Sequence, residues 1–287
     1  MGSKPRKVLD VIKPQPVLEG AGVRLKRSIA TTTLDQLDPF LLFDHFGSGN
    51  SEDYIKGFPM HPHRGIETVT YMIEGVVNHK DSMGNSGSIS GGDVQWMTSG
   101  GGIMHEEMPQ PCRREMVGFQ LWVNLPARLK MTTPRYQNLV SEQIPEIARE
   151  DGVRIRVIAG EVDGVRGPVK DIFADPTYLD VSIPANGTFI HSIESGQTVF
   201  AYVFEGEAAF GGDGEGKEEM VTHPRLVVFG DAGFFEARTT GPHVRFLLIS
   251  GKPLKEPIAR YGPFVMNTQA EIQQALEDLR NGTFVKN

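Results

Sequence analysis

The chain has 287 residues, of which 39% are hydrophobic and 23% charged, and its formal net charge is −7 at pH 7. This composition is that of an ordinary soluble protein, the length fits two domains of modest size, and the acidic balance disfavours direct binding to nucleic acid. No apolar run is long enough to span a membrane, and the single cysteine, Cys112, excludes an internal disulfide.

These features predict a cytoplasmic protein. The N-terminal stretch MGSKPRKVLDVIK has no apolar core of signal-peptide length. Its basic cluster KPRK (4–7) is more typical of a solvated surface, and a nuclear address in a eukaryote is the alternative.

Short strand-like runs follow one another along the chain, with glycine- and proline-rich turns between them. They include ETVTYMIEG, GDVQWM, VGFQLWVNL, VRIRVIAG, TYLDVSI, TVFAYVFEG, RLVVFG and VRFLLISG. Many short strands at regular spacing predict an all-β protein built from antiparallel sandwiches or barrels. One helix is predicted near the C-terminus, in TQAEIQQALEDLRNG, where Thr268 and Glu271 form a capping box. Its apolar stripe consists of Ile272, Ala275, Leu276 and Leu279.

The chain divides into two similar halves. VTYMIEG (69–75) resembles VFAYVFEG (199–206), and the segment 125–152 is richer in proline and charge, as expected of a passage between domains. We therefore expect one β domain over 1–135 and a second over 136–287, with the helix in the second.

The stretch FPMHPHRGIETVTYMIEG (58–75) carries two histidines at spacing two. Side chains at this spacing share one face of a strand. If the whole stretch is a single strand, that face also carries Glu67, Val69, Tyr71 and Ile73.

A second pair with the same spacing, His105 and Glu107, lies in GGDVQWMTSGGGIMHEEMP (91–109). A lone His-x-His is more often a surface or packing feature, but a second imidazole and a carboxylate at the same spacing favour a metal site. Three nitrogens and one oxygen suit Fe(II), Mn(II), Ni(II), Cu(II) or Zn(II), and the absence of thiolates argues against a structural zinc site. The candidate ligands are His61, His63, His105 and Glu107.

Three further residues are candidates for supporting the ligands or contacting a substrate. Glu67 could be a fifth ligand or an outer-shell acceptor. Arg64 could hold an anionic substrate oxygen, although a surface or salt-bridge role is the more common one. Gln120, in VGFQLWVNL, is the third candidate.

Other residues of the first half have simpler interpretations. Histidine 45, in LLFDHF, is expected to be packed or hydrogen-bonded, and His79 to lie in a solvated loop. A set of apolar side chains is expected to belong to the hydrophobic core. The alternative is that they form the walls of a binding site for aromatic rings. These are Val69, Tyr71, Ile73, Trp96 and Met97.

The second half is expected to be free of metal. Counting back from Gly206 as from Gly75 places Ser192 and Glu194 where the first half has its His-x-His pair. His243 follows Asp231 at the distance that separates His105 from Asp93, but Arg245 takes the place of Glu107 and would repel a cation.

These motifs resemble the cupin pattern, G-x5-H-x-H with a following Glu and Gly and then a G-x-D strand with a late histidine. Within cupins they are most similar to the pirin family. The similar segments span residues 37 to 268: LDPFLLFDHF, FPMHPHRGIETVTYMIEG, GGDVQWMTSGGGIMHEEMP and GPFVMNT. Glu106, beside the candidate ligand His105, is a local departure from the family pattern, in which a small residue also occurs at this position.

The resemblance implies a bicupin, two antiparallel β-barrels with a short C-terminal helix and a metal in the N-terminal barrel alone. It implies iron held by His61, His63, His105 and Glu107, with manganese, nickel, copper, cobalt or zinc as alternatives. An extra carboxylate at Glu106 should face away unless the strand is bulged.

The resemblance also implies two functions of different classes. One is quercetin 2,3-dioxygenase activity, in which a flavonol and O2 are the substrates. In that reaction Glu107 could release from the metal, or act as the catalytic base that accepts the hydroxyl proton. The other is a metal- and redox-dependent regulatory role through a protein partner, either a transcription factor or a metabolic enzyme.

Overall fold

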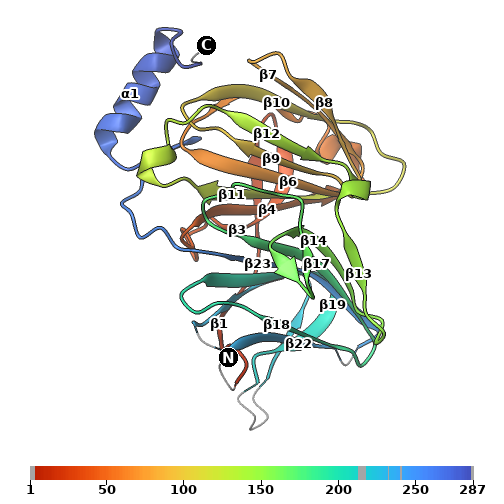
Figure 1. Cartoon of the computed structure of the whole chain (residues 1–287). Coiled ribbons are helices and arrows are strands. Elements are labelled where there is room, and N and C mark those ends of the chain that lie inside the picture. The colour runs from red at the N-terminus through yellow and green to blue at the C-terminus, as the bar shows by residue number, and fades with distance from the viewer. Residues whose placement is uncertain (1–3, 213–217, 232, 240, 286–287) are drawn as a thin grey trace. The chain divides into compact units, whose positions relative to one another are not determined.

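The computed structural model describes residues 4–212, 218–231, 233–239 and 241–285. The chain divides into two compact units. The first unit comprises Gln15–Ser141 and Leu254–Asn287, and the second comprises Met1–Pro14 and Glu142–Pro253. Figure 1 shows the strands and the C-terminal helix of the chain.

The first unit contains a seven-stranded antiparallel sheet in the order β12-β9-β6-β11-β4-β3-β2. Its strands are β2 (Gln15–Glu19), β3 (Val23–Ile29), β4 (Phe40–Ser48), β6 (Ile66–Glu74), β9 (Val94–Thr98), β11 (Met116–Asn124) and β12 (Arg135–Leu139). A four-stranded sheet, β5-β10-β7-β8, belongs to the same unit. Its strands are β5 (Phe58–His63), β7 (Val76–Asp81), β8 (Ser86–Ser90) and β10 (Ile103–Pro109).

Alternating burial within these strands places an apolar core between the two sheets. In β3, Val23 and Leu25 are buried and Arg24 is exposed, as period two requires. Val23 and Leu25 pack in one cluster with Met72 of the seven-stranded sheet and Val77 of the four-stranded sheet. The sheets are therefore two layers joined by side chains that meet between them.

The C-terminal segment returns to the first unit and ends in the predicted helix. It forms the hairpin β24 (Ala259–Tyr261) and β25 (Phe264–Met266), then α1 (Gln269–Arg280). The capping box is confirmed, because Thr268 accepts from Glu271 N–H and the Glu271 side chain accepts from Thr268 N–H. Ile272 packs with Phe264 and Phe284, which places the helix in the first unit rather than in the expected domain 136–287.

The second unit is built from ten strands and a short hairpin. The strands are β1 (Val8–Ile12), β13 (Glu146–Ala148), β14 (Arg154–Ala159), β17 (Thr177–Pro184), β18 (Thr188–Ser192), β19 (Thr198–Phe210), β20 (Glu219–Thr222), β21 (Arg225–Phe229), β22 (Phe234–Arg238) and β23 (His243–Gly251), and the hairpin is β15 (Glu161–Val162) and β16 (Val165–Arg166). Strand β1 pairs with β21, so the first residues of the chain belong to this unit and not to the expected domain 1–135.

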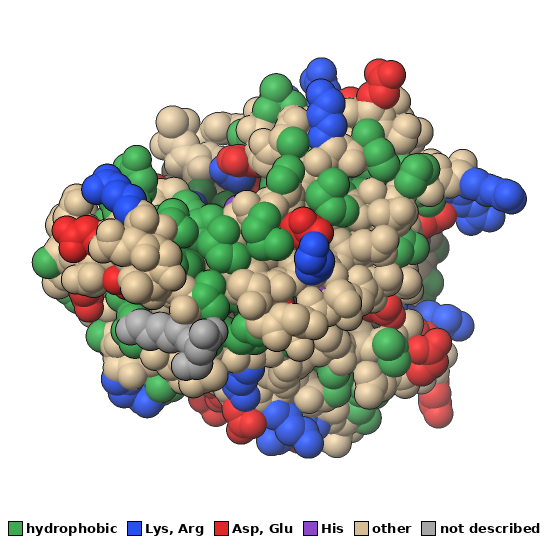
Figure 2. All heavy atoms as spheres, turned by 90° about the horizontal axis from the view of Figure 1, so that it is seen from above, with side chains coloured by type: hydrophobic (Ala, Val, Ile, Leu, Met, Phe, Trp, Pro, Cys, Tyr) green, Lys and Arg blue, Asp and Glu red, His purple; other side chains and the backbone are tan. Residues whose placement is uncertain are grey.

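The described residues contain one α-helix, and the predicted all-β class with a C-terminal helix is confirmed. The sheets are open rather than closed into the expected barrels. Three single-turn 3-10 helices, η1 (Ser51–Asp53), η2 (Ala127–Leu129) and η3 (Ser141–Gln143), complete the described elements. Among the residues that the structure describes, no helix has the length and apolar character needed to cross a membrane. On the face shown in Figure 2, charges of both signs are interspersed with apolar side chains.

Candidate metal centre

The histidine-bearing stretch 58–75 forms two strands, not one. Strand β5 belongs to the four-stranded sheet and β6 to the seven-stranded sheet. Gly65 lies between them at φ +82°, where a Cβ atom would come within 2.0 Å of the Val265 carbonyl oxygen, so only glycine fits. The turn breaks the alternation, and our expectation that Glu67 shares a face with His61 and His63 is wrong.

Three histidines converge at the start of this turn. Strand β5 pairs with β10 so that His61 is the register partner of His105. The ring centroid of His105 lies 4.4 Å from that of His61 and 5.1 Å from that of His63. One nitrogen from each ring lies within 4.8 Å of the others, so the three side chains can hold a metal ion.

The hydrogen bonds of these rings leave nitrogen lone pairs available to a cation. The Nδ1–H of His61 donates to the Pro59 carbonyl oxygen at 3.0 Å, which leaves Nε2 of the neutral ring as the lone-pair nitrogen. That Nε2 lies 3.0 Å from Nε2 of His63. Both ring nitrogens of His105 are buried without a hydrogen-bond partner among the described residues. A divalent ion would satisfy one nitrogen of each ring.

Burial keeps the imidazole rings of His63 and His105 neutral. Desolvation, followed by the proximity of His61, lowers the pKa of His105 to about 3. Desolvation, followed by the proximity of His105 and His61, lowers the pKa of His63 well below its ordinary value. Neutral imidazole is the form that ligates metals, so the fold prepares both rings for coordination at neutral pH.

Glu107 follows His105 by two residues on β10 and lines the same cavity as His61 and His63. The hydroxyl of Thr70 lies 3.2 Å from Glu107 Oε1 and 2.7 Å from Gln120 Oε1. Burial raises the pKa of Glu107, with His61 acting in the opposite direction. Glu107 is not part of the group of donor atoms that lie within 4.8 Å of one another, which consists of the three histidines. A buried carboxyl group beside that group can act as a base or as a further ligand.

Glu106 points away from this cluster. Strand β10 pairs regularly with β7 from His105 to Pro109, so the register shift between His105 and Glu107 is an extra residue in β5. The Glu106 carboxylate lies 3.8 Å from Lys80 Nζ. Strand β10 therefore presents His105 and Glu107 on one face and Glu106 on the other.

His79 is a buried neighbour of this cluster that the sequence interpretation missed. It lies on β7 as the register partner of Glu107, and its ring stacks on Tyr136 with centroids 5.9 Å apart. The expected solvated loop is wrong. Val77, His79 and Asp81 share the buried face of β7, but only Val77 is apolar, so the stretch VVNHKD lacks the apolar alternation that signals a strand. His45, by contrast, is packed as expected, with its ring 4.9 Å from that of Phe119.

Arg64 and Glu67 lie away from the cavity, and Gln120 lines it. The Arg64 guanidinium is buried, with its Nη1–H donating to Asp278 Oδ2 at 2.7 Å and Nε–H to the Gly101 carbonyl oxygen at 2.7 Å. Glu67 accepts from Thr98 Oγ1–H at 2.7 Å on the opposite face of the sheet from Thr70. Arg64 therefore anchors α1, and Glu67 supports the strand pair β6–β9.

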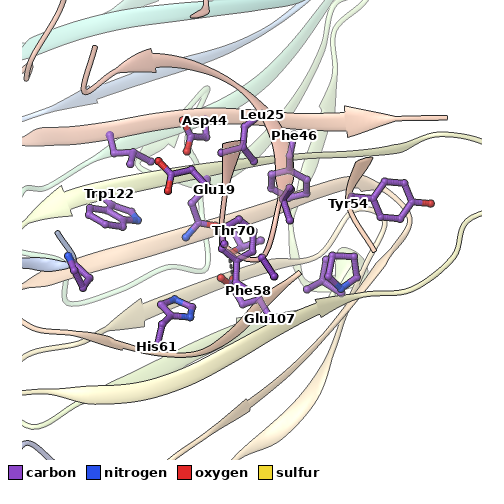
Figure 3. Close-up of a pocket in the computed structure, with 18 of the residues that line it drawn as sticks. Glu19, Leu25, Asp44, Phe46, Tyr54, Phe58, His61, Thr70, Glu107 and Trp122 are labelled. Carbon is purple, nitrogen blue, oxygen red and sulfur yellow. Dashed lines mark hydrogen bonds between the residues drawn. The ribbon is translucent and has the colours of Figure 1, made fainter. Parts of the chain in front are cut away.

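A cavity of about 510 Å³ opens beside the histidines. Figure 3 shows His61 and Glu107 on one side of the labelled residues and Asp44 and Glu19 on the other. The aromatic residues that line it are Phe46, Tyr54, Phe58 and Trp122. The apolar residues considered as alternative walls are absent from this lining, so their core interpretation is the correct one for Val69, Tyr71, Trp96 and Met97, which are buried.

The second unit has no comparable cluster of donors among its described residues. Strand β22 pairs with β18 as β10 pairs with β5, so β22 rather than β23 is the counterpart of β10. The proposed equivalence of His243 and His105 is therefore wrong, since His243 lies on β23. Phenylalanine rings fill the core instead, namely Phe189, Phe210, Phe229, Phe235 and Phe246.

Known proteins are similar to this chain in sequence and in fold. A family model described as pirin matches residues 22–123, and one described as the pirin C-terminal cupin domain matches residues 178–285. A Pseudomonas aeruginosa protein with the provisional name quercetin 2,3-dioxygenase is 43% identical over 281 residues, covering 96% of this chain and 97% of its own. A pirin-like protein of Caulobacter vibrioides is 43% identical over 280 residues, covering 97% and 99%.

A solved structure gives the same result. The crystal structure of a quercetin 2,3-dioxygenase from Acinetobacter baumannii has a TM-score of 0.87 and 34% identity, with 98% of each chain covered. The two β units are accordingly those of a bicupin. The chain belongs to the pirin family.

Proposed function

We propose that this protein is a metal-dependent dioxygenase of the quercetin 2,3-dioxygenase type, acting on a flavonol and O2. The observation that carries the proposal is a cluster of three histidines beside an aromatic-lined cavity of about 510 Å³ that Glu107 also lines. A cavity of this size suits a small planar ligand. The relatives named quercetin 2,3-dioxygenase support the same reaction.

The metal would be held by His61, His63 and His105, with Glu107 as the fourth ligand. Imidazole and carboxylate donors fit Fe(II), which we propose as the native metal, and they also fit Mn, Ni, Cu, Co or Zn. When bound, the metal supplies Lewis acidity toward the flavonol oxygens and the means of activating O2. Elemental analysis of protein purified without added metal tests its identity.

The chain's own residues bind the flavonol and manage its proton. Phe46, Phe58 and Trp122 provide apolar surfaces for the flat rings and exclude water from them. Glu107 accepts the proton of the flavonol 3-hydroxyl, because burial raises its pKa toward that of a useful base. Thr70 holds Glu107 Oε1 in place during this transfer.

The overall reaction balances without another reactant. Two carbon–carbon bonds of the central ring break, the carbon that carried the 3-hydroxyl leaves with its oxygen as carbon monoxide, and both atoms of O2 enter the ring-opened ester. The proton held by Glu107 returns to the product carboxylate.

Oxygen uptake and carbon monoxide release with quercetin test this proposal. We expect activity in the metal-loaded protein, its loss in His61→Ala and Glu107→Ala, and its retention in the control Glu106→Gln, whose side chain faces Lys80. Unchanged uptake in the first two variants contradicts the assigned site. No turnover with any flavonol, together with protein binding that follows the redox state of the metal, would favour the regulatory alternative with a transcription factor or metabolic enzyme.

A further inference from the structure

The wall of the cavity formed by the C-terminal segment carries an arginine, Arg260, that the proposed reaction does not use. It lies on β24 and lines the cavity together with Gly262 and Pro263 of the following turn. The guanidinium carbon lies 5.1 Å from the centroid of Trp122 and rests over that ring. Trp122 in turn packs edge-on against His63, with centroids 5.1 Å apart. Trp122 therefore contacts both a histidine of the candidate metal centre and the Arg260 guanidinium.

The two arginines that line the cavity differ in how their donors are used. Arg27 donates from Nε and Nη2 to the two oxygens of Asp44, at 2.8 and 2.7 Å, and from Nη1 to Glu19 at 2.7 Å. These two carboxylates neutralise the charge of Arg27 and accept hydrogen bonds from all three of its nitrogens. Arg27 is therefore a structural part of the wall.

Arg260 has no such carboxylate partner. Its Nη1–H donates to the Leu41 carbonyl oxygen at 3.2 Å, and Nε–H to the Gly262 carbonyl oxygen at 3.5 Å. Within the described residues, Nη2 has neither a hydrogen-bond acceptor nor an ion pair. A guanidinium that is stacked on an aromatic ring and keeps free donors is suited to planar anions.

Charged side chains of both signs surround Arg260. Arg27, Asp44 and Glu19 together carry a net charge of about −1 when all are ionised, and Arg260 offsets it. Burial, followed by the proximity of Arg27, lowers the pKa of Arg260, and Asp35 acts in the opposite direction. An anion seated on Nη2 would meet a cation at contact distance, while the Asp44 and Glu19 oxygens are already engaged by Arg27.

We propose that Arg260 and Trp122 form a subsite for an anionic group on the part of an aromatic substrate that is remote from the histidines. The substrate class is then a planar aromatic acid or phenolate, such as a flavonol ionised or acidified on an outer ring. The ring stacks along Trp122 and its acidic group accepts from Arg260 Nη2–H. The choice of a flavonol skeleton rests on the proposed function. The anion subsite itself does not depend on that function.

Binding and turnover measurements test the subsite separately. Calorimetry on the metal-loaded protein compares 2-naphthoate with 2-naphthamide, which share a ring system and differ in charge. We expect naphthoate to bind about tenfold or more tightly, as one charge-assisted hydrogen bond provides. Equal affinity in the unaltered protein would overturn the inference without any variant.

Three variants assign the preference to a residue. Arg260→Gln should abolish it, Arg260→Lys should retain part of it, and Arg24→Gln should leave it intact. Arg24 is the matched control because it is exposed on β3 and paired with Asp53, outside the cavity. A preference that survives in Arg260→Gln places the carboxylate on the metal or the histidines and refutes the subsite.

Oxygen uptake then separates this inference from the proposed function. With quercetin 5′-sulfonate, Arg260→Gln should raise KM about tenfold at nearly constant kcat, and with neutral 3-hydroxyflavone it should change KM less than about threefold. Equal losses with both substrates would mean that Arg260 only holds the C-terminal segment. If no flavonol is turned over but naphthoate binding still depends on Arg260, the dioxygenase proposal fails and the subsite stands.

Discussion

Thr70 on β6 and Glu107 on β10 are joined by a 3.2 Å hydrogen bond that links the two sheets of the first unit at the candidate metal centre. Thr70 is also 2.7 Å from Gln120 on the neighbouring strand β11. One hydroxyl proton therefore serves two acceptors, and the orientation of Glu107 depends on it.

Thr70→Val keeps the shape of the side chain and removes this donor. We expect kcat to fall about tenfold with little change in KM, since the Glu107 carboxyl group loses its orientation. The free energy of unfolding should fall by about 1–3 kcal/mol because a buried acceptor is left unpaired. Steady-state oxygen uptake and urea denaturation measure the two effects.

Thr98→Val is the control for Thr70→Val. Thr98 donates to the buried Glu67 on the other face of the same sheet. A similar loss of stability with an unchanged kcat is expected. If Thr98→Val lowers kcat as much, Thr70 has no special role at the metal centre.

Glu107→Gln and Glu106→Gln change neighbouring carboxylates that face opposite ways. Glu107→Gln should weaken metal binding by at least about tenfold if Glu107 is the fourth ligand that we propose, because it removes an anionic oxygen. Glu106→Gln should leave metal content unchanged, since it loses only a 3.8 Å surface contact with Lys80. Elemental analysis after dialysis against a graded chelator series measures both, and equal metal loss in the two variants would exclude Glu107 as a ligand.

Arg64→Met tests the anchor of the C-terminal helix. Arg64 and Asp278 form an ion pair whose side chains are only 1% and 14% exposed. Removing one partner of such a pair leaves the other uncompensated, so we expect a loss of about 3 kcal/mol in the free energy of unfolding. The exposed pair Arg24–Asp53 is the control, and Arg24→Met should cost under about 1 kcal/mol.

A double-variant cycle completes this test. Arg64→Met combined with Asp278→Asn should be less destabilising than the sum of the single variants, because the two side chains interact directly. Strict additivity in urea denaturation would show that the ion pair contributes nothing.

The metal-free protein should lose stability in acid. Burial lowers the folded-state pKa of His105 from the ordinary 6.5 to about 3. Between these pH values the unfolded chain binds a proton that the folded chain does not, so stability falls as pH decreases from 6.5 toward 3. The limit is about 1.4 kcal/mol per pH unit for one histidine.

Urea denaturation of chelator-treated protein at pH 7, 6 and 5 measures this slope. His105→Gln should reduce the slope, since it removes one of the two buried histidines whose pKa is lowered, and His63 should maintain the remainder. A stability that is independent of pH in the unaltered chain would contradict the burial of a neutral imidazole.

The local pattern of the sequence was sufficient for the three-histidine cluster and for the helix. His61 with His63, and His105 with Glu107, lie at spacing two, and a strand places such pairs on one face wherever it lies. The capping box of Thr268 and Glu271 is likewise local, and the structure has the helix where the sequence predicts it.

Only the tertiary structure decided which other residues reach the cavity. The turn at Gly65 passes the chain from one sheet to the other and reverses the alternation, so Glu67 faces away although it lies four residues from His63. His79 and Arg260 enter the surroundings of the site from strands that pair or fold back later in the chain. A period of two fixes the face of a side chain within one strand, but the sheet that receives the strand, and the distant segments that close the cavity, are set by packing between residues far apart in sequence.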